Sequence, residues 1–207
     1  MDSQDVRRQW AERTGEYSPE YYAYYGPDET SEAIRSILAD RVGRSASVLE
    51  LGCSSGRHLA ALRDDGFDDL AGVEVNPDAF AVMEEHYPDL AEAGTFFDGA
   101  IEDVLPRFDD GQFDAIFSVE TLQHVHPDAA GVFEDVARIT GDVLITVENE
   151  GSPGERGTDD PGVNYVHDEF PIYYRDWSAL FADLGMDEVA TEEQDRDTRR
   201  VFQTADG

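Results

Sequence analysis

Apolar residues occur along the chain in short continuous runs, and longer segments with helical spacing separate these runs. The runs end at polar residues or glycine, as buried strands do. They lie near residues 48, 71, 95, 114 and 143. Strands that alternate with helices in this way form a parallel sheet with helices packed on its faces. The hydrophobic pattern therefore predicts an open α/β sheet.

The two ends of the chain extend this pattern. Residues 1–43 read as a helical region ahead of the first strand. Later elements are expected to be a helix from near Pro127 to Ile139, a strand over residues 142–147, a helix from Trp177 that ends at Gly185, and strands near 187 and 200. Because 207 residues with 40% hydrophobic content suffice for one substantial core, we expect a single domain. Its parts are an N-terminal helical cap (1–43), a ligand-binding core (44–150), and an insertion with the terminal strands (151–207).

The segment VLELGCSSGRHL at residues 48–59 is a strand, a small-residue turn and the start of a helix. Gly52 and Gly56 allow a sharp turn and close approach to a ligand, toward which the helix directs free N–H groups. Dinucleotide enzymes and methyltransferases share such turns. Glu50 beside the turn would repel a pyrophosphate, but it suits a cationic amino group such as that of S-adenosylmethionine. A solvated charge at the strand end is the alternative for Glu50.

Two further strand ends carry groups suited to a nucleoside. Glu74 ends the strand of residues 70–75, where a carboxylate can accept both ribose hydroxyls. After the third strand, the small Ala100 and the apolar Ile101 could flank an adenine ring. A fourth strand over residues 113–120 ends at the same edge, which is where open α/β sheets bind ligands.

Four segments in this order, VLELGCSSGRHL, LAGVEVNPDAF, GAIEDVLP and FDAIFSVETLQHVHP, make the chain resemble the class I S-adenosylmethionine-dependent methyltransferase family. The resemblance covers roughly residues 45–150. It implies a Rossmann-like, doubly wound, seven-stranded and mostly parallel sheet with helices on both faces. It also implies S-adenosylmethionine as the cofactor.

By this resemblance, the donor would lie against Glu50, Gly52, Cys53, Gly56, Glu74, Val75, Ala100, Ile101, Ser118 and Val119. The turn and the fourth strand would hold the methionine part, Glu74 the ribose, and residues 100–101 the adenine. Cys53 is expected to pack in the donor loop, since transfer from a sulfonium needs no protein thiol. Two departures from the family pattern are Ser54 in place of a glycine and Ala100 in place of an acid. The second leaves recognition of the adenine to backbone groups.

Methyl transfer from a sulfonium depends mainly on an acceptor held in line behind the methyl carbon. A general base helps when that acceptor is a hydroxyl. His124 and His126 follow the fourth strand, and their alternation places one of them toward the pocket, for which His124 is our candidate. A histidine that caps a helix or packs in the core is the alternative. No metal is expected, because the pair lacks a third ligand unless residues 167–169 supply one.

Two aromatic flanks are the candidates for binding the acceptor. Tyr21 and Tyr25 belong to a tyrosine cluster that could form a mobile lid and exclude water, although packing on the sheet is the alternative for half of the cluster. The polar segment over residues 148–175 is too long for a mere connection. Its Tyr173 and Arg175 would add aromatic and anion-pairing contacts, unless Arg175 caps its own helix.

The other strong feature of the sequence is its net charge. The chain has 47 acidic residues against 15 basic ones, all of them arginine, and a formal net charge of -32. The simplest explanation is a halophile's salt-filled cytoplasm, where acidic surfaces stay soluble and the absence of lysine stems removes apolar surface. A surface that avoids nucleic acid is the alternative. The sequence offers no basic patch for DNA or RNA.

A single cysteine excludes an intramolecular disulfide, and no apolar run reaches the length of a membrane span or a secretory signal. We therefore expect a cytoplasmic protein without a membrane partner, whose oligomeric state the sequence does not indicate. The function expected is methyl transfer to a small-molecule acceptor. A nonenzymatic nucleotide-binding module, a protein or RNA methyltransferase and an NAD-dependent oxidoreductase stay open as alternatives.

The charge predicts that the folded state gains stability from salt. Self-repulsion opposes the compact state in dilute buffer, whereas the Debye length falls to about 3 Å in molar salt. We expect the thermal unfolding midpoint, followed by circular dichroism, to rise steadily with KCl concentration. Sucrose is the control, because it does not screen charge. A midpoint that is independent of KCl would contradict this prediction.

Overall fold

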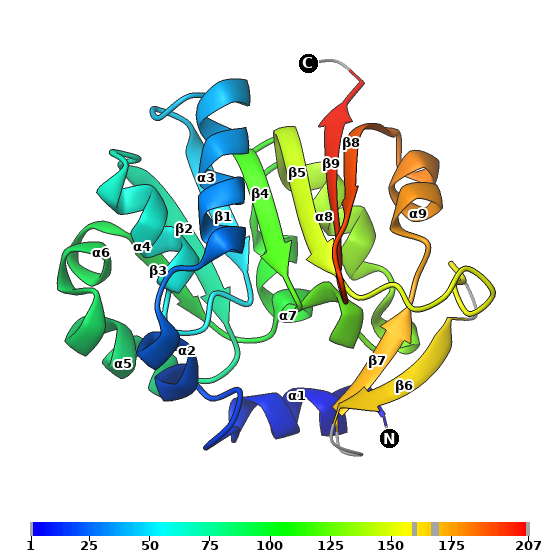
Figure 1. The fold of residues 1–207 in the computed structure, drawn as a ribbon, viewed down its shortest axis with the longest axis horizontal. Helices are drawn as coiled ribbons and strands as arrows, with labels where there is room; N and C mark the ends of the chain where they lie inside the picture. The colour runs from blue at the N-terminus through cyan, green and yellow to red at the C-terminus, as the bar shows by residue number, and fades with distance from the viewer. Residues whose placement is uncertain (1, 159–160, 167–169, 206–207) are drawn as a thin grey trace.

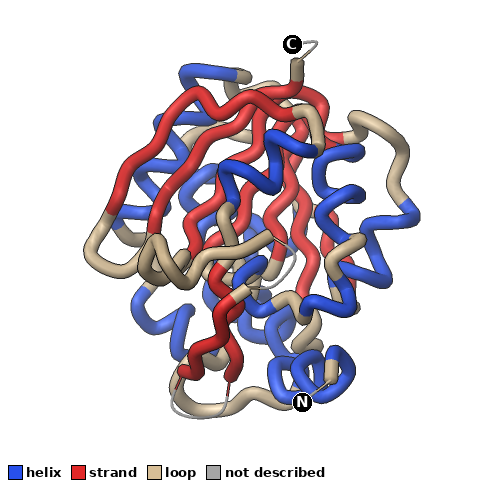
Figure 2. Tube along the Cα trace, turned by 90° about the vertical axis from the view of Figure 1, so that its right-hand side faces the viewer, coloured by secondary structure: helices blue, strands red, loops and turns tan. Residues whose placement is uncertain are grey.

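Seven strands form one sheet in the order β3-β2-β1-β4-β5-β9-β8, and helices cover both of its faces (Figures 1 and 2). This computed structural model describes residues 2–158, 161–166 and 170–205. The strands of the sheet are β1 (Ser47–Leu51), β2 (Asp69–Glu74), β3 (Thr95–Asp98), β4 (Phe113–Val119), β5 (Thr140–Glu148), β8 (Met186–Glu193) and β9 (Thr198–Thr204). The predicted fold class is confirmed.

The order of the strands creates a crevice beside β1. Strands β1 to β5 pair in parallel, whereas β9 is antiparallel to both β5 and β8. From β1 the chain winds first toward β2 and β3, and then in the opposite direction through β4 and β5. At such a reversal the connections leave the sheet on opposite sides, so a ligand can enter outside the carboxyl ends of the strands.

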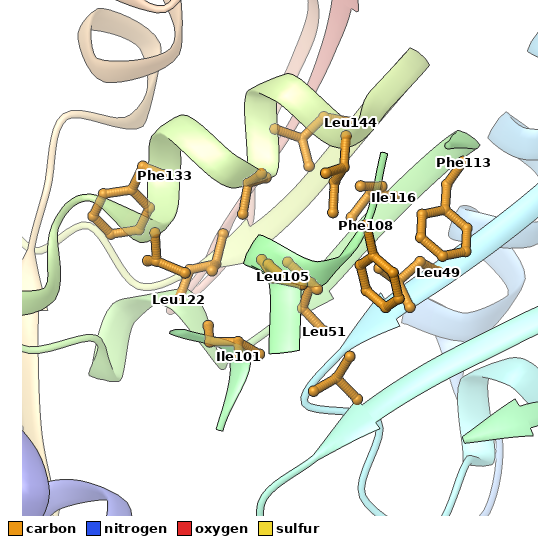
Figure 3. Packing of buried hydrophobic residues seen from close by; sticks show 14 of the residues in the cluster. Leu49, Leu51, Ile101, Leu105, Phe108, Phe113, Ile116, Leu122, Phe133 and Leu144 are labelled. Carbon is orange, nitrogen blue, oxygen red and sulfur yellow. The ribbon is translucent and has the colours of Figure 1, made fainter. Parts of the chain in front are cut away.

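Successive residues of β1 face two different cores, because side chains alternate along a strand. Val48 packs with α3 (Glu29–Arg41), α4 (Arg57–Asp64), α5 (Asp78–His86) and α6 (Pro88–Ala93). Leu49 packs with α7 (Ile101–Val104), α8 (Val132–Ile139) and α9 (Trp177–Asp183), as part of the cluster drawn in Figure 3. Each fully buried Leu or Phe stabilises the fold by roughly 1.5–3 kcal/mol. None of the helices in the described ranges is both long and apolar enough to cross a membrane.

The helix expected to begin near Pro127 begins later. A separate 3-10 turn spans Pro127–Ala129, and α8 begins only at Val132. The ring of His126 accepts a hydrogen bond from the Asp128 backbone N–H at 3.1 Å, so it caps the short turn. The apolar residues expected at helical spacing, from Val132 to Ile139, are buried on α8.

Helices α1 (Ser3–Ala11) and α2 (Pro19–Tyr25) lie across the carboxyl ends of the central strands (Figure 1). Asp2 begins α1 with a reciprocal pair of hydrogen bonds to Asp5. Arg7 then joins α1 to the start of α7, where it pairs with Glu102 at 3.3 Å and Asp103 at 3.1 Å. The N-terminal segment is thereby fastened over the edge at which the strands end.

The polar segment after β5 forms a second, two-stranded antiparallel sheet from β6 (Gly162–Val166) and β7 (Phe170–Tyr174). No strands were predicted in this segment, which was expected to be an insertion on the acceptor side. The ring of Phe170 lies 4.5 Å from the Trp10 ring, centroid to centroid, so this hairpin packs against α1. The hairpin thereby supports Trp10 of α1 from outside.

Candidate active site

A cavity lies at the carboxyl ends of β1, β2 and β4, where α1 and α2 cover it. Segments that are far apart in the sequence form its wall: the glycine turn, the end of β2, the start of α7, the loop after β4, and the N-terminal helices. Among the residues predicted to bind the donor or the reacting groups, those on the wall are Glu50, Gly52, Cys53, Glu74, Val75, Ala100, Ile101, Val119 and His124.

The glycine turn keeps its shape because a carboxylate from the neighbouring strand holds it. Glu74 accepts hydrogen bonds from the backbone N–H groups of Ser54 at 2.7 Å and Asn76 at 2.8 Å. Gly52 has φ +71°, and a Cβ on it would lie 2.2 Å from the hydroxyl oxygen of Thr121. Only glycine therefore fits at position 52. Glu74 lines the cavity, and its oxygens keep lone pairs that the two backbone hydrogen bonds do not use.

Glu50 is a buried acid with an oxygen that lacks a protein partner. Its side chain is 2% exposed, and its Oε2 atom has no hydrogen bond among the described residues. Burial raises the pKa of Glu50 well above its usual range, and nearby Glu74 raises it further, whereas Arg57 lowers it. A buried acceptor of this kind is costly unless a donor group reaches it. The cavity thus offers a site for a cationic or hydrogen-bond-donating group.

Strained backbone is confined to the cavity wall. Within the described ranges, Tyr17, Ser54 and Glu120 are the non-glycine residues with positive φ, at +65°, +47° and +50°. All three line the cavity. A left-handed conformation costs an L-residue roughly 1–2 kcal/mol, so the surrounding contacts must maintain it. Such strain is commonly concentrated at functional sites.

The end of the cavity near α7 carries apolar side chains beside the Arg7–Glu102 ion pair, and α1 closes it. Ala100 and Ile101 are 8% exposed, and they share the wall with Val6 of α1. The Arg7 ion pairs with Glu102 and Asp103 fasten α1 at this point. A flat aromatic group bound at this end would make apolar contacts with these side chains and hydrogen bonds with the backbone.

Arg57 is a wall residue that the sequence analysis missed. It is the first residue of α4, pairs with Asp28 at 2.9 Å, and has its guanidinium 5.0 Å from the ring centre of Tyr22. A cation at a helix N-terminus is unfavourable, because it opposes the helix dipole. The position of Arg57 at the start of α4 was therefore the signal in the sequence that it has a role other than stabilising the helix. With Glu50 nearby, the cavity presents an acidic and a basic group at the same end.

His124 lies on the wall beneath Trp10, with ring centres 4.8 Å apart. Its Nδ1 atom is 2.7 Å from the carbonyl oxygen of Pro171, which only accepts hydrogen bonds, so Nδ1 carries the proton. Its Nε2 atom therefore carries the lone pair, which accepts a hydrogen bond from the Gln123 amide at 3.3 Å. Burial lowers the pKa of His124 to about 4. The imidazole is neutral at neutral pH.

Two of the predicted donor contacts lie off the wall. Gly56 begins α4 in a left-handed conformation at φ +82°, and a Cβ there would meet Leu90 and Met83 at 2.8 and 2.9 Å. Its small size serves packing of α4 on α5 and α6. Ser118 is fully buried and donates its hydroxyl to Glu148 at 2.6 Å, on the inner side of the loop after β4. Cys53, by contrast, is on the wall, and burial raises the pKa of its thiol.

The four residues predicted to bind the acceptor also lie off the wall. Tyr25 is 62% exposed, and Tyr21 packs against neighbouring tyrosine rings. Tyr173 is 5% exposed and meets the His126 ring, while Arg175 is 1% exposed and bonds to backbone carbonyls. The aromatic residues that the wall contains are Trp10, Tyr17 and Tyr22. Neighbouring members of the same cluster were therefore the better choice.

Metal binding finds no support in the part of the chain that the structure describes. No group of three or more His, Cys, Asp or Glu side chains there has the arrangement needed to hold an ion. Residues 167–169, considered above as a source of a third ligand, lie outside the described ranges.

Comparison with known proteins agrees with this geometry. A family model described as a methyltransferase domain matches residues 49–142, somewhat less than half of the chain. The matched part contains the glycine turn, the end of β2 and the loop after β4. The chain matches none of the curated proteins with which it was compared.

Solved structures share the fold at low sequence identity. The PH0226 protein from Pyrococcus horikoshii has 18% identity and a TM-score of 0.67, over 93% of this chain and 100% of that one. A Burkholderia thailandensis 1,6-didemethyltoxoflavin-N1-methyltransferase, bound to its substrate and S-adenosylhomocysteine, has 16% identity and a TM-score of 0.66, over 85% and 78%. The Synechocystis magnesium protoporphyrin IX methyltransferase, bound to S-adenosylmethionine, has 14% identity and a TM-score of 0.64, over 98% and 90%. Residues 49–142 of this chain are thus similar to a methyltransferase domain.

Proposed function

We propose that this protein is an S-adenosylmethionine-dependent methyltransferase that acts on a small-molecule acceptor by in-line displacement. One observation carries the proposal: four separate strand ends of a methyltransferase domain place their polar and glycine residues around one cavity. The unpartnered oxygen of Glu50 and the cation of Arg57 suit the amino and carboxylate groups of the methionine part. A pyrophosphate has no cationic group that could donate a hydrogen bond to Glu50.

Each part of the donor would have its own section of the wall. Glu74 would accept the ribose hydroxyls, and Val75, Ala100 and Ile101 would flank the adenine. Gly52, Cys53 and Val119 would border the methionine part, whose amino group would approach Glu50. Bound in this way, the donor supplies a methyl group already activated by the positive sulfur. The protein then has to exclude water and position the acceptor.

His124 is the residue proposed to act on the acceptor. It is neutral, its Nε2 carries the lone pair, and it faces the cavity from the loop after β4. The acceptor's O–H or N–H would displace the 3.3 Å hydrogen bond from the Gln123 amide to Nε2, which would then take the proton when the acceptor is a hydroxyl. Trp10 above it and the hairpin beside Trp10 would exclude water.

A small acceptor fits the enclosure of the cavity better than a macromolecule does. Helix α1 lines the cavity with Val6 and Trp10 and is fastened by the ion pairs of Arg7. The two methyltransferases compared above are named for small-molecule substrates. We further propose that the protein works in a salt-rich cytoplasm, on the basis of its net charge of -32 and the absence of lysine.

The class of acceptor can be tested with donor labelled on the transferred methyl group. The protein is incubated in molar KCl with a cell extract, from which small molecules, protein and RNA are then separated. Label in the small-molecule fraction supports the proposal. Label confined to protein or RNA would identify a macromolecule methyltransferase, and binding of the donor without transfer to any fraction would indicate a nonenzymatic module.

Replacing Glu74 with Ala should weaken donor binding by about 1–3 kcal/mol, because a charge-assisted acceptor for the ribose is lost. Calorimetric titration with S-adenosylhomocysteine measures the change. Asp98→Ala is the matched control, since Asp98 ends the neighbouring strand in register with Glu74 but lies off the cavity wall. Unchanged affinity of the Glu74 variant would remove Glu74 from the ribose site.

Replacing Arg57 with Gln should weaken S-adenosylhomocysteine binding by about tenfold, because an ionic hydrogen bond to the carboxylate is worth about 1.5–3 kcal/mol. Binding of 5′-methylthioadenosine, which lacks the amino acid part, should stay unchanged. Arg63→Gln is the control on the same helix, because Arg63 pairs with Asp68 away from the cavity. Equal losses for both ligands would show that Arg57 acts on the fold and not on the carboxylate.

Replacing His124 with Ala should lower kcat by at least about tenfold while donor affinity changes little, as expected for a group that acts in the transition state. Burial holds the pKa of His124 near 4, so it is already in its base form well below neutral pH. The wild-type pH–rate profile should therefore lack an acid limb near 6.5, the ordinary histidine value. His86→Ala on the exposed side of α5 is the control. Wild-type turnover of the His124 variant would assign His124 to structure alone.

A further inference from the structure

The loop after β4 is a short segment with little regular structure, yet it carries Thr121, His124 and Val125 to the cavity wall. The part of the loop that reaches the cavity, residues 120–125, has one 3-10 turn, Leu122–His124, and a second turn, Pro127–Ala129, follows it. A single turn of this kind has too few internal hydrogen bonds to be stable by itself. Contacts from other elements must hold it.

Glu148 holds the loop from the side of β5. Its side chain is 0% exposed. Its Oε1 atom accepts from the backbone N–H of Leu122 at 3.1 Å and of Thr121 at 3.4 Å, and from the Ser118 hydroxyl at 2.6 Å. Its Oε2 atom accepts from the backbone N–H of Gln123 at 3.1 Å. Three successive N–H groups of the loop thus depend on one carboxylate.

Arg175 holds the same loop from the side of β7. Its side chain is 1% exposed. It donates to the carbonyl oxygen of Val125 at 2.6 Å and to that of Leu122 at 3.5 Å. Its guanidinium lies 5.0 Å from the ring centre of Phe133. Leu122 therefore gives its N–H to a buried anion and its C=O to a buried cation.

The same two elements also fix the ring of His124. Next to Glu148, the backbone N–H of Asn149 donates to the Gln123 side chain at 2.6 Å. That oriented amide then donates to Nε2 of His124. On the other side, Pro171 of β7 accepts from Nδ1. The position and the tautomer of His124 are therefore set from the ends of β5 and β7.

It is energetically costly to hold one loop with two buried charged side chains. Burial raises the pKa of Glu148 to about 7 and lowers that of Arg175 to about 10, so both charges are held against a desolvation penalty. A loop needed only as a connection could be held by apolar packing at less cost. Neither side chain lines the cavity.

We propose that Glu148 and Arg175 are positioning residues for methyl transfer, which hold the backbone of residues 121–125 between them and so fix the ring of His124 at the cavity wall, where the acceptor would replace Gln123 as the partner of Nε2. This inference rests on the proposed methyltransferase function. It also explains why Arg175, expected from the sequence to bind the acceptor, lies outside the cavity.

The test replaces Glu148 with Gln, which keeps the shape but puts an NH₂ group where an oxygen accepts a backbone N–H. We expect kcat to fall by about tenfold to a hundredfold, the range that small misplacements of reacting groups produce, with donor Kd within about twofold of the wild type. The ¹⁵N signals of the His124 ring, identified by their loss in His124→Gln, should shift away from those of a neutral Nδ1–H imidazole.

Glu150→Gln is the matched control. Glu150 is 2% exposed and ends the same segment, but it pairs with Arg200 at 2.6 Å and Arg156 at 2.8 Å and makes no hydrogen bond to the loop. We expect it to leave kcat and the His124 signals unchanged. If Glu148→Gln does not fold in molar KCl, Arg175→Lys takes its place, with Arg200→Lys as its control.

Three outcomes separate the possibilities. The proposal is supported if kcat falls and the His124 signals shift in Glu148→Gln, or in Arg175→Lys where it takes its place, but not in the control variant. Wild-type kcat and signals in Glu148→Gln, or equal effects in Glu150→Gln, would overturn it. A wild-type protein that binds no donor would overturn the proposed function, and the His124 signals would then still decide whether the two charges position the ring.

Discussion

Carboxylates at strand ends hold the backbone that forms this cavity. Parallel strands finish with N–H groups that have no partner in the sheet, and irregular loops there need acceptors. Glu74 supplies them to the glycine turn, and Glu148 supplies them to the loop after β4. Rigid strands fix both carboxylates, so each loop is held in a single conformation. Gly52 of the glycine turn then packs against Thr121 of the loop after β4. The geometry of the proposed donor site and acceptor site depends on these contacts.

The sequence was informative wherever structure follows from local pattern. Runs such as residues 115–117 are apolar on both faces because a central parallel strand is covered by helices on each side, and this made the core strands predictable. Gly52 and Glu74 were predictable for the same reason: each comes directly at the end of a strand, and the parallel order brings these ends to one edge. The donor half of the cavity therefore follows closely from the order of motifs.

The residues expected to bind the acceptor lie off the cavity wall, because their placement depends on contacts between distant segments. Tyr21 and Tyr22 are neighbours on α2, and Tyr22 is the one that lines the cavity. Arg175 has the chemistry to bind an anion, but β7 carries it inward to the carbonyl of Val125, fifty positions earlier. The pairing of β7 with β6 and the packing of Phe170 on Trp10 are likewise absent from any local pattern.

The roles proposed for these residues all depend on the cofactor that the cavity binds. Calorimetric titration of the wild-type protein with S-adenosylmethionine and, separately, with NAD identifies that cofactor, in molar KCl so that self-repulsion does not loosen the fold. We expect saturable binding of S-adenosylmethionine at one site for each chain and no measurable binding of NAD. Binding of NAD alone, or of neither compound to folded protein, would exclude S-adenosylmethionine as the cofactor.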